Sequence, residues 1–526
     1  MMNSEAHLTR PCTLADLLPS GCERQRAVVI PEGGPQLTYA ELRERISALA
    51  DALSRNGIRG GDRVAIVLPN GLEFLAAFLA VTSLGAIAAP LNPTFTVDEY
   101  RSYMAVLGAG AAILGPGAQA ARDAAAALQL SVCEAQLSVG AQVRLEAIST
   151  RCATPGTVEI PGPDDVALLL HTSGTTSRPK GVPLTHRNLM TAVQTIRSCY
   201  RLTPADVSLV VMPLFHVHGL LGATLSALGA GGTVVLQPRF SARSFCGTVT
   251  RYGVTWYSAV PTIHRSVLQR AVEEKLPAGK LRFIRSCSAA LTPELWGQLE
   301  DRFGAPVVQA YGMTEAAHQI ASNPLPPRSC KRSTVGIATG LAITIRDEKG
   351  TILPTGMRGE VVISGDSVTP GYDNNPEANA AAFIGRWLRT GDEGWLDGDG
   401  FLTLTGRIKE MINRGGEKIS PLEVEAVLSA HPAVAEAACF GVPDEKYGEE
   451  IHAAVVLKAE VSEQELMAFC REHVAQFKAP KRISVVKDLP RTTTGKIQRQ
   501  QLAARCRGEL TAEGASVDGR DETRRR

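Results

Sequence analysis

The sequence lacks several features that mark specialised classes of protein. Aromatic residues make up only 5% of its 526 residues and charged residues 21%, whereas hydrophobic residues make up 44%. The formal net charge is +2, from 55 basic and 53 acidic residues, so the chain has no overall basic field for binding nucleic acid or an anionic membrane. This composition excludes disordered, collagen-like and small disulfide-stapled chains and is typical of a globular protein.

Targeting and membrane signals are equally scarce. The first residues, MMNSEAHLTRPCTLADLL, have no basic region followed by an apolar run, so we expect no secretory signal, and the ending DGRDETRRR is not a peroxisomal S-K-L address. The 11 cysteines, an odd number without C-x-x-C pairs, predict reduced thiols in a cytoplasmic protein. The charge-poor stretches 74–91 and 207–238 contain Pro and Gly breakers, which favours buried core elements over membrane spans.

The hydrophobic pattern predicts an α/β fold. A capping box, Thr38 with Glu41, predicts a helix, and Ser420 with Pro421 and Glu423 predicts another. Apolar runs alternating with helices predict largely parallel sheets with covered faces. These strands are expected at 63–68, 166–171, 209–212, 232–236, 255–259, 281–286 and 306–309. From about residue 335, shorter spacing predicts antiparallel strands at 342–346, 358–364 and 401–405.

We expect a large N-terminal body of layered, largely parallel sheets and helices, and a small α+β C-terminal domain. The predicted domains are residues 1–408 and 409–508, with a disordered tail at 509–526. No internal repeat and no low-complexity tract interrupts them.

The most specific local feature is the segment HTSGTTSRPKG at 171–181, directly after an apolar strand. Its hydroxyls and backbone N–H groups can surround one anion, glycine allows close approach, and a lysine adds positive charge. The spacing differs from a Walker A loop. The segment predicts a phosphate site formed by Thr172, Ser173, Gly174, Thr175, Thr176 and Lys180.

This segment resembles the phosphate loop of the acyl-adenylate-forming superfamily, which includes acyl-CoA synthetases. The resemblance extends from about residue 25 to residue 505, through YGMTE at 311–315, TGD at 390–392, GR at 406–407 and TGK at 494–496. It implies a ligase that uses ATP, Mg²⁺ and coenzyme A. An acid first forms an acyl-adenylate with release of pyrophosphate, and its acyl group then passes to CoA with release of AMP.

The resemblance also implies roles for individual residues. Thr314 would bind the α-phosphate and Glu315 would help to hold Mg²⁺, which prefers oxygen ligands. Asp392 and Arg407 would bind the ribose. Adenine would lie between the Ser288–Ala289 segment and Tyr311.

Lys496 resembles the family lysine that bridges the substrate carboxylate and the α-phosphate. Lys409 lies where the family has its hinge, so the C-terminal domain is expected to be mobile. Its rotation would withdraw Lys496 and bring in Arg414, Gly415 and Gly416 for the thioester step, with the glycines admitting pantetheine.

Polar residues at the expected acid pocket, His216, His264, Arg285, Ser288 and His318, favour a small acid with a second carboxylate. His216, Ser288 and His318 are the predicted substrate residues, and His216 is also expected to act in catalysis. Segments 171–185, 283–288 and 413–421 resemble the oxalate–CoA ligase branch, which implies oxalate as the acid.

Alternatives are another short or dicarboxylic acid, and a stand-alone enzyme that loads a carrier protein. A non-catalytic member is disfavoured because Lys496, Glu315 and Asp392 are all present. The expected partners are small molecules only, the acid, ATP and CoA, and the sequence predicts no oligomeric state.

Overall fold

The computed structural model describes residues 13–138, 142–149, 160–172, 180–271, 279–492 and 495–506. The chain divides into two compact units. The first unit comprises Met1–Thr390 and Gly394–Leu404, and the second comprises Gly391–Glu393 and Thr405–Arg526. The change of unit at Thr405 falls just before the boundary predicted between residues 408 and 409. The predicted tail, 509–526, lies outside the described residues.

Helix α1 (Tyr39–Arg55) shows how local sequence sets an element. Thr38 Oγ1 accepts a hydrogen bond from the Glu41 N–H at 3.3 Å, and the Glu41 carboxylate accepts from the Thr38 N–H at 2.7 Å. The predicted capping box is therefore confirmed. Leu42 and Leu49, one and three turns along, are buried and hold the helix to the core.

The second predicted capping box is wrong. Helix α12 (Pro421–Ala430) does begin after Ser420, but the Ser420 side chain donates to the Thr405 carbonyl and caps no helix N–H. Glu423 instead accepts from Lys478 Nζ at 2.7 Å. Tertiary partners have replaced the local ones, and proline at the first helical position suffices to start the helix.

The first unit contains a seven-stranded sheet, largely parallel, with the order β7-β6-β5-β3-β4-β8-β9. The outer pairs β6/β7 and β8/β9 are antiparallel, and the inner pairs are parallel. Its strands are β3 (Arg63–Val67), β4 (Ile87–Pro90), β5 (Ala111–Leu114), β6 (Ser131–Ser138), β7 (Gln142–Ser149), β8 (Val166–Thr172) and β9 (Lys180–Thr185).

A nine-stranded sheet has the order β16-β15-β14-β13-β12-β10-β11-β1-β2, with a parallel centre and antiparallel outer strands. Its strands are β1 (Arg26–Val29), β2 (Gln36–Thr38), β10 (Val207–Val210), β11 (Thr233–Leu236), β12 (Trp256–Ala259), β13 (Phe283–Ser286), β14 (Val307–Met313), β15 (His318–Ser322) and β16 (Ile337–Ala338). The parallel strands predicted from apolar runs are thus confirmed.

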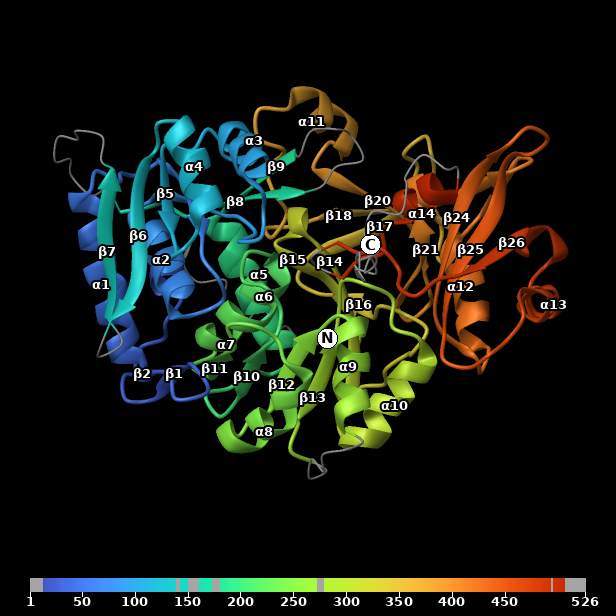
Figure 1. The fold of residues 1–526 in the computed structure, drawn as a ribbon, viewed down its shortest axis with the longest axis horizontal. Helices are drawn as coiled ribbons and strands as arrows, with labels where there is room; N and C mark the ends of the chain where they lie inside the picture. Colours follow the sequence, from blue (N-terminus) through green and yellow to red (C-terminus); the bar gives the residue numbers. More distant parts are fainter. Residues whose placement is uncertain are drawn as a thin grey trace, which may run out of the picture. The chain divides into compact units, whose positions relative to one another are not determined.

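Helices cover both faces of the two sheets, as Figure 1 shows for the first unit. One large apolar core unites residues of both sheets with α1, α2 (Leu72–Ser83) and α5 (His186–Cys199), so these helices form a layer between the sheets. Helices α3 (Val97–Leu107) and α4 (Gln119–Ala127) cover the other face of the seven-stranded sheet. Helices α8 (Ala242–Tyr252), α9 (Pro261–Ala271) and α10 (Pro293–Phe303) cover the other face of the nine-stranded sheet.

A third, antiparallel sheet follows the two large ones. Its strands are β17 (Ala342–Arg346), β18 (Gly359–Ser364), β19 (Phe383–Ile384), β20 (Trp387–Leu396) and β21 (Leu402–Arg407), with α11 (Pro376–Ala382) before β19. The three antiparallel strands predicted from residue 335 onwards are confirmed, whereas β20 was not predicted.

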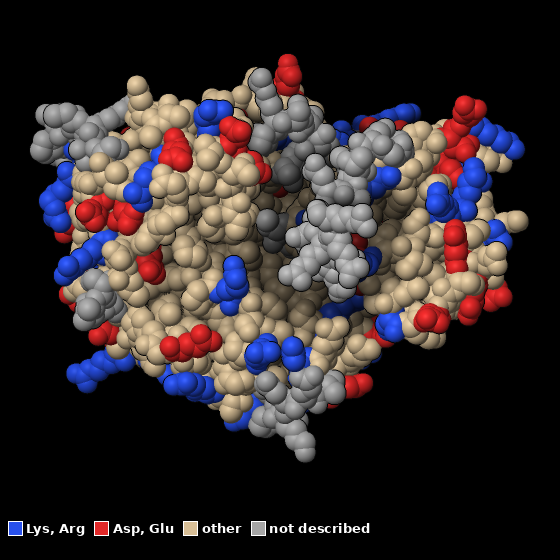
Figure 2. Space-filling view, in the orientation of Figure 1, with Lys and Arg blue, Asp and Glu red and all other residues tan. Residues whose placement is uncertain are grey.

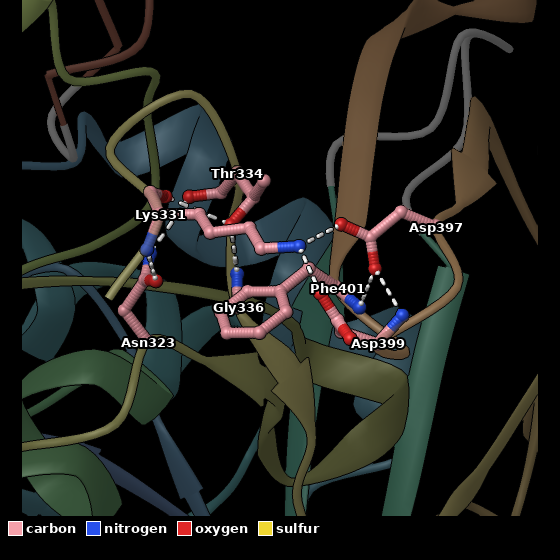
Figure 3. Close-up of polar contacts among 7 residues, drawn as sticks. All are labelled: Asn323, Lys331, Thr334, Gly336, Asp397, Asp399 and Phe401. Atoms are coloured by element: carbon pink, nitrogen blue, oxygen red, sulfur yellow. Dashed lines mark hydrogen bonds and ion pairs between the residues drawn. The ribbon is translucent and has the colours of Figure 1, made fainter. Parts of the chain in front are cut away.

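A lysine between β15 and β16 binds the turn between β20 and β21, and both segments belong to the first unit (Figure 3). Lys331 Nζ lies 2.5 Å from Asp397 Oδ2 and 2.7 Å from Asp399 Oδ2, and 4.6 Å above the Phe401 ring. Asp397 Oδ1 accepts from the N–H groups of Asp399 and Phe401, both at 2.9 Å. Both carboxylates are thereby occupied within the fold, which assigns this acidic turn a structural part.

The second unit is a small α+β domain. Its sheet contains β22 (Ile412–Arg414), β23 (Glu417–Ile419), β24 (Val434–Asp444), β25 (Gly448–Leu457) and β26 (Arg482–Val485). Helices α12 and α13 (Glu463–His473) bury Val424, Leu428 and Leu466 against it. Helix α14 (Arg499–Cys506) ends the described chain.

The surface charges agree with the balanced composition. On the face drawn in Figure 2, basic and acidic side chains are interspersed. No helix in the described part of the chain combines the length and apolar character needed to cross a bilayer. The two charge-poor stretches are instead α2 with β4, and β10 with β11 and the short helical segment between them.

Candidate active site

Several predicted site residues follow neighbouring strands of the nine-stranded sheet. Strands β12, β13 and β14 are adjacent and parallel, so their carboxyl ends share one edge. Ser288 lies two residues beyond β13, and Thr314 and Glu315 lie in a short 3₁₀ turn (Thr314–Ala316) directly after β14. Thr314 and Glu315 are buried, 9% and 6% exposed. Parallel topology therefore gathers these side chains from distant sequence positions.

Glu315 is oriented by Tyr372, a residue that the sequence did not single out. The Tyr372 hydroxyl donates to Glu315 Oε1 at 3.1 Å, and Lys180 Nζ lies 4.8 Å above the Tyr372 ring. The backbone N–H of Thr369 also donates to the Glu315 carbonyl at 2.7 Å. The structure thus brings Lys180, at the start of β9, close to Glu315. No local signal in the sequence connects Tyr372 with either residue.

The predicted phosphate loop follows β8 and ends at the start of β9. These strands are antiparallel, and Thr172 pairs with Lys180. Ser173, Gly174, Thr175 and Thr176 lie outside the described residues, so the phosphate role assigned to them stays a prediction.

His318 has an unusual backbone that aims its side chain. Ala317 and His318 have φ of 48° and 98°, in the left-handed region that most residues avoid. The strand pair β14/β15 shifts register between Tyr311 and Gly312, and a Cβ at Gly312 would overlap the His318 carbonyl oxygen. Glycine at this position makes the tight reversal possible, and the reversal directs His318 into the interior.

The three predicted substrate residues meet around His218. His218 Nδ1 lies 3.0 Å from Ser288 Oγ, and its ring stacks on that of His318 with centroids 5.1 Å apart. The His218 backbone N–H donates to His216 Nδ1 at 3.2 Å. His216, Ser288 and His318 therefore converge on one small region, and His218 is the residue that connects them.

His318 is a neutral hydrogen-bonding group. His218 and His318 are buried, 0% and 2% exposed. Burial lowers the pKa of His318 well below its usual range, and the neighbouring Arg285, His218 and His216 lower it further.

His264 does not join this cluster. Its Nδ1 lies 3.0 Å from the Tyr257 hydroxyl. Tyr257 packs with the α8–α10 layer, whereas Ser258, the next residue of β12, contacts His218 on the opposite face of the sheet. The expectation that His264 could face the acid pocket is therefore wrong.

The predicted adenine residues lie at the same edge of the sheet. Tyr311 is 8% exposed and packs in an apolar cluster with Ala316 and Ile320. Ser288 is half-buried with φ of 70°, and Ala289 is exposed. Their role in binding adenine stays a prediction.

Asp392 and Arg407, the predicted ribose residues, form an ion pair of 3.0 Å between Oδ1 and Nε. Both belong to the second unit. The Asp392 side chain is 8% exposed and the Arg407 side chain 51%. Arg407 thus orients a buried carboxylate while much of its own guanidinium faces solvent.

Lys496 is exposed at the end of a tight turn in the second unit. The Thr492 N–H donates to the Lys496 carbonyl at 2.8 Å, and the Lys496 N–H donates to Thr492 Oγ1 at 3.1 Å. Gly495 has φ of 83°, which suits glycine. Arg499, three residues on, binds Glu410 at 2.7 Å, next to the predicted hinge residue Lys409. The start of helix α14 (Arg499–Cys506), three residues after Lys496, is thereby tied to the residue beside the predicted hinge.

Gly415 and Gly416 form the turn between β22 and β23, and Arg414 is the last residue of β22. Gly415 and Gly416 have φ of 61° and 94°, as a two-residue hairpin turn of this kind requires. Arg414 forms two hydrogen bonds with Glu450, at 2.5 and 3.2 Å, and lies 4.1 Å above the Tyr447 ring. The arginine that flanks the glycine turn is thus anchored by Glu450 and Tyr447.

The residues present fit a magnesium ion held jointly with a substrate. Glu315 offers a buried carboxylate. Within the described ranges, no group of three or more His, Cys, Asp or Glu side chains could hold a metal by itself. Mg²⁺ is commonly bound by one or two carboxylates with substrate phosphates and water, and this donor set suits that arrangement.

Comparison with known proteins places the chain in a family. Residues 20–373 match the AMP-binding enzyme family, and residues 423–496 match the AMP-binding enzyme C-terminal domain. The chain belongs to the AMP-binding enzyme family.

Individual relatives are similar along nearly the whole chain. An oxalate–CoA ligase of Arabidopsis thaliana is 47% identical over 503 residues, which cover 93% of this chain and 98% of that protein. An oxalate–CoA ligase of Saccharomyces cerevisiae is 42% identical, covering 91% of this chain and 94% of that protein. The crystal structure of ATP-bound MatB from Rhodopseudomonas palustris has a TM-score of 0.85 and 30% identity, covering 94% of this chain and 99% of that one.

Proposed function

We propose that this protein is an AMP-forming acid–CoA ligase whose acid is oxalate. The observation that carries the proposal is the convergence of His216, Ser288 and His318 around His218 in a member of this family. Its similarity to oxalate–CoA ligases supports the same assignment.

The first half-reaction joins oxalate to AMP. One oxalate carboxylate attacks the α-phosphorus of ATP, a phosphorus–oxygen bond to the leaving group breaks, and pyrophosphate leaves. Thr314 binds the α-phosphate, and Lys180 with the phosphate loop binds the outgoing pyrophosphate. When bound at Glu315, Mg²⁺ neutralises phosphate charge. Lys496 bridges the two reacting anions, so that positioning and charge neutralisation lower the barrier.

The second half-reaction moves the oxalyl group to CoA. The CoA thiol releases its proton to solvent and its sulfur attacks the oxalyl carbonyl. The bond to AMP breaks, and AMP leaves with the electron pair. The proposed mobile domain, residues 409–508, turns about Lys409 between the two steps. Arg414 and its glycine turn then line the path of pantetheine, where the absence of side chains admits a narrow thiol arm.

Oxalate fits the pocket because its second carboxylate can accept hydrogen bonds there. His216, Ser288 and His318 supply donors, and an acid with a methyl group in that place leaves them unpaired. A site built to hydrogen-bond its substrate can reject such an analogue by about 10⁴-fold.

Steady-state kinetics of His318→Ala test this proposal. The variant is expected to raise KM for oxalate, or lower kcat/KM for oxalate, while KM for ATP changes little. A variant that weakens ATP and oxalate equally contradicts the assignment of His318 to the acid.

The compartment stays a prediction of the sequence, the cytoplasm. The nine cysteines that the structure describes are all free thiols, as in proteins kept in a reducing environment.

A further inference from the structure

Arg285 carries a fully buried positive charge that no carboxylate balances. It lies in β13 and is 0% exposed. Its guanidinium donates to Tyr200 and Ser258 at 2.8 Å, and to His318 and Gln319 at 2.9 Å. All four partners are neutral, and among the described residues no Asp or Glu forms an ion pair with it.

Such a charge is costly without a counter-ion. Removing one partner of a buried ion pair is strongly destabilising because the remaining charge is uncompensated. Hydrogen bonds to neutral groups orient a guanidinium but leave its charge in place. The natural counter-ion for Arg285 is therefore an anion that arrives from outside the chain.

Arg285 also fixes where the proton of His318 lies. An arginine donates hydrogen bonds and accepts none, so His318 Nε2 must be the acceptor. In a neutral imidazole the other nitrogen then carries the hydrogen, and His318 is neutral because burial lowers its pKa. Nδ1 of His318 therefore presents an N–H group. Among the described residues the side chain has no hydrogen bond other than the one with Arg285.

A second chain of hydrogen bonds starts at the same guanidinium. Ser258 Oγ accepts from Arg285, so its own hydrogen is directed to its other partner, His218 Nε2, 2.7 Å away. His218 Nδ1 then carries a hydrogen and donates to Ser288 Oγ at 3.0 Å. The Ser288 hydroxyl hydrogen is left to donate to a ligand.

Packing brings the ends of these two hydrogen-bond series close together. The His218 and His318 rings stack, so the Ser288 hydroxyl and the His318 Nδ1–H group can donate to neighbouring atoms of one ligand. A Cβ at Gly222 would lie 2.5 Å from His318 Nε2 and 3.2 Å from Arg285 Nη1. Glycine at position 222 is therefore what allows the arginine and the histidine to meet.

We infer that Arg285 is a positioning residue that selects acids with a second anionic group, although it binds the substrate only through other side chains. It supplies the permanent charge of the pocket, and through His318 and the Ser258–His218–Ser288 chain it turns two neutral side chains into hydrogen-bond donors. This inference rests on the proposed function and goes beyond it, because it assigns the selectivity for a dianion to a fully buried residue that does not contact the substrate.

The test compares oxalate with oxamate, which replaces one carboxylate by a neutral carboxamide of similar size. The readout is kcat/KM of the purified full-length protein for each acid, together with KM for ATP. Arg285→Gln removes the charge but can still donate to His318, and Arg285→Lys keeps the charge. Ser258→Ala keeps the charge and interrupts only the chain to Ser288. The control is Ser208→Ala, since Ser208 is a buried serine of neighbouring β10 whose Oγ donates to the Ala223 carbonyl.

Arg285→Gln is expected to lower the preference for oxalate over oxamate by about 30-fold, the range of a hydrogen bond assisted by charge. KM for ATP should stay within about twofold of the wild-type value. Arg285→Lys should retain most of the wild-type preference for oxalate over oxamate. Ser258→Ala should raise KM for oxalate by about tenfold, and Ser208→Ala should match the wild type. If Arg285→Gln fails to fold, Arg285→Lys and Ser258→Ala decide: a preserved preference in Arg285→Lys with a raised oxalate KM in Ser258→Ala supports the inference.

The inference is overturned if Arg285→Gln folds and keeps the wild-type preference, or if Ser258→Ala binds oxalate as the wild type does. These outcomes differ from failure of the proposed function, in which the wild type itself does not use oxalate.

Discussion

The Tyr372 hydroxyl donates a 3.1 Å hydrogen bond to Glu315 Oε1. This contact joins the turn after β14 to the segment between β18 and α11. One carboxylate oxygen is thereby held in place, which leaves the other better oriented for a metal ion. A tyrosine that no motif identifies thus has a part in the proposed magnesium site.

Tyr372→Phe should weaken the use of Mg²⁺. The variant keeps the aromatic ring beneath Lys180 and loses the hydrogen bond from the hydroxyl to Glu315. We expect the Mg²⁺ concentration for half-maximal adenylation to rise by about tenfold, as is common for partners of metal ligands. Pyrophosphate release measured over a Mg²⁺ series checks this, with Tyr252→Phe, remote from Glu315, as the control. An unchanged Mg²⁺ dependence would contradict a part for Tyr372 in the proposed magnesium site.

Lys496→Ala should separate the two half-reactions. Loss of the bridging charge should lower the rate of acyl-adenylate formation by about 100-fold or more. Thioester formation from supplied oxalyl-adenylate should be largely preserved, because the proposed domain rotation would withdraw Lys496 before that step. Single-turnover measurements of each step test this, with exposed Lys487→Ala of the same unit as the control. An equal loss in both steps would refute the two-conformation mechanism.

Lys409→Pro should affect mainly the second step. Proline fixes φ near −65° and removes a backbone N–H, which hinders rotation at this position. We expect adenylation to survive better than transfer to CoA. Lys409→Ala loses the same charge but keeps a flexible backbone. Comparing the two variants separates the effect of the lost charge from the effect of the restricted backbone. If the proline variant retains both steps equally, the hinge lies elsewhere.

Buried histidine predicts how stability depends on pH. Burial lowers the pKa of His264 to about 3, whereas an unfolded histidine titrates near 6.5. Between these values the unfolded chain binds the additional proton, so the free energy of unfolding falls as the pH drops from about 6.5. The slope from this group reaches about 1.4 kcal/mol per pH unit.

Chemical denaturation at pH 5 and pH 6.5 measures this effect. The folded His264→Gln variant should lose less stability than the wild type between the two values. His473→Gln, which alters an exposed histidine, should follow the wild type. If the wild type and His264→Gln lose the same unfolding free energy between pH 6.5 and pH 5, His264 is not the group responsible.

Much of the fold could be predicted because its signals are local. The capping box at Thr38 and Glu41 depends on residues three apart, and the parallel strands are marked by apolar runs and breakers. The predicted box at Ser420 and Glu423 failed because Thr405 and Lys478, distant in sequence, compete for the same side chains. Strand β20 escaped prediction because its buried positions are not marked by apolar residues. Every second residue from Leu388 to Gly394 is buried, but the later three are Thr390, Asp392 and Gly394.

The site was predictable only to the extent that it lies in motifs. The motif around Tyr311–Glu315 and the polar residues His216, Ser288 and His318 could be recognised in the sequence. Tyr372 and the chain from Arg285 through Ser258 to His218 depend on tertiary packing across β12, β13 and β15, which no spacing in the sequence encodes. His264 shows that closeness in sequence does not place a residue in the site. It lies only six residues after Ser258, yet it contacts Tyr257 on the other side of the sheet.

The proposed oxalate–CoA ligase activity is tested most directly by measuring CoA-dependent AMP release. The assay uses the wild-type protein with ATP, Mg²⁺ and a panel of acids. The panel should contain oxalate, malonate, acetate, butyrate and an aryl acid, each with and without CoA. We expect oxalate to have the highest kcat/KM and acetate a value lower by several orders of magnitude. Sustained turnover should require free CoA. Preference for butyrate or the aryl acid, or adenylation of oxalate without transfer to CoA, would contradict the proposed activity.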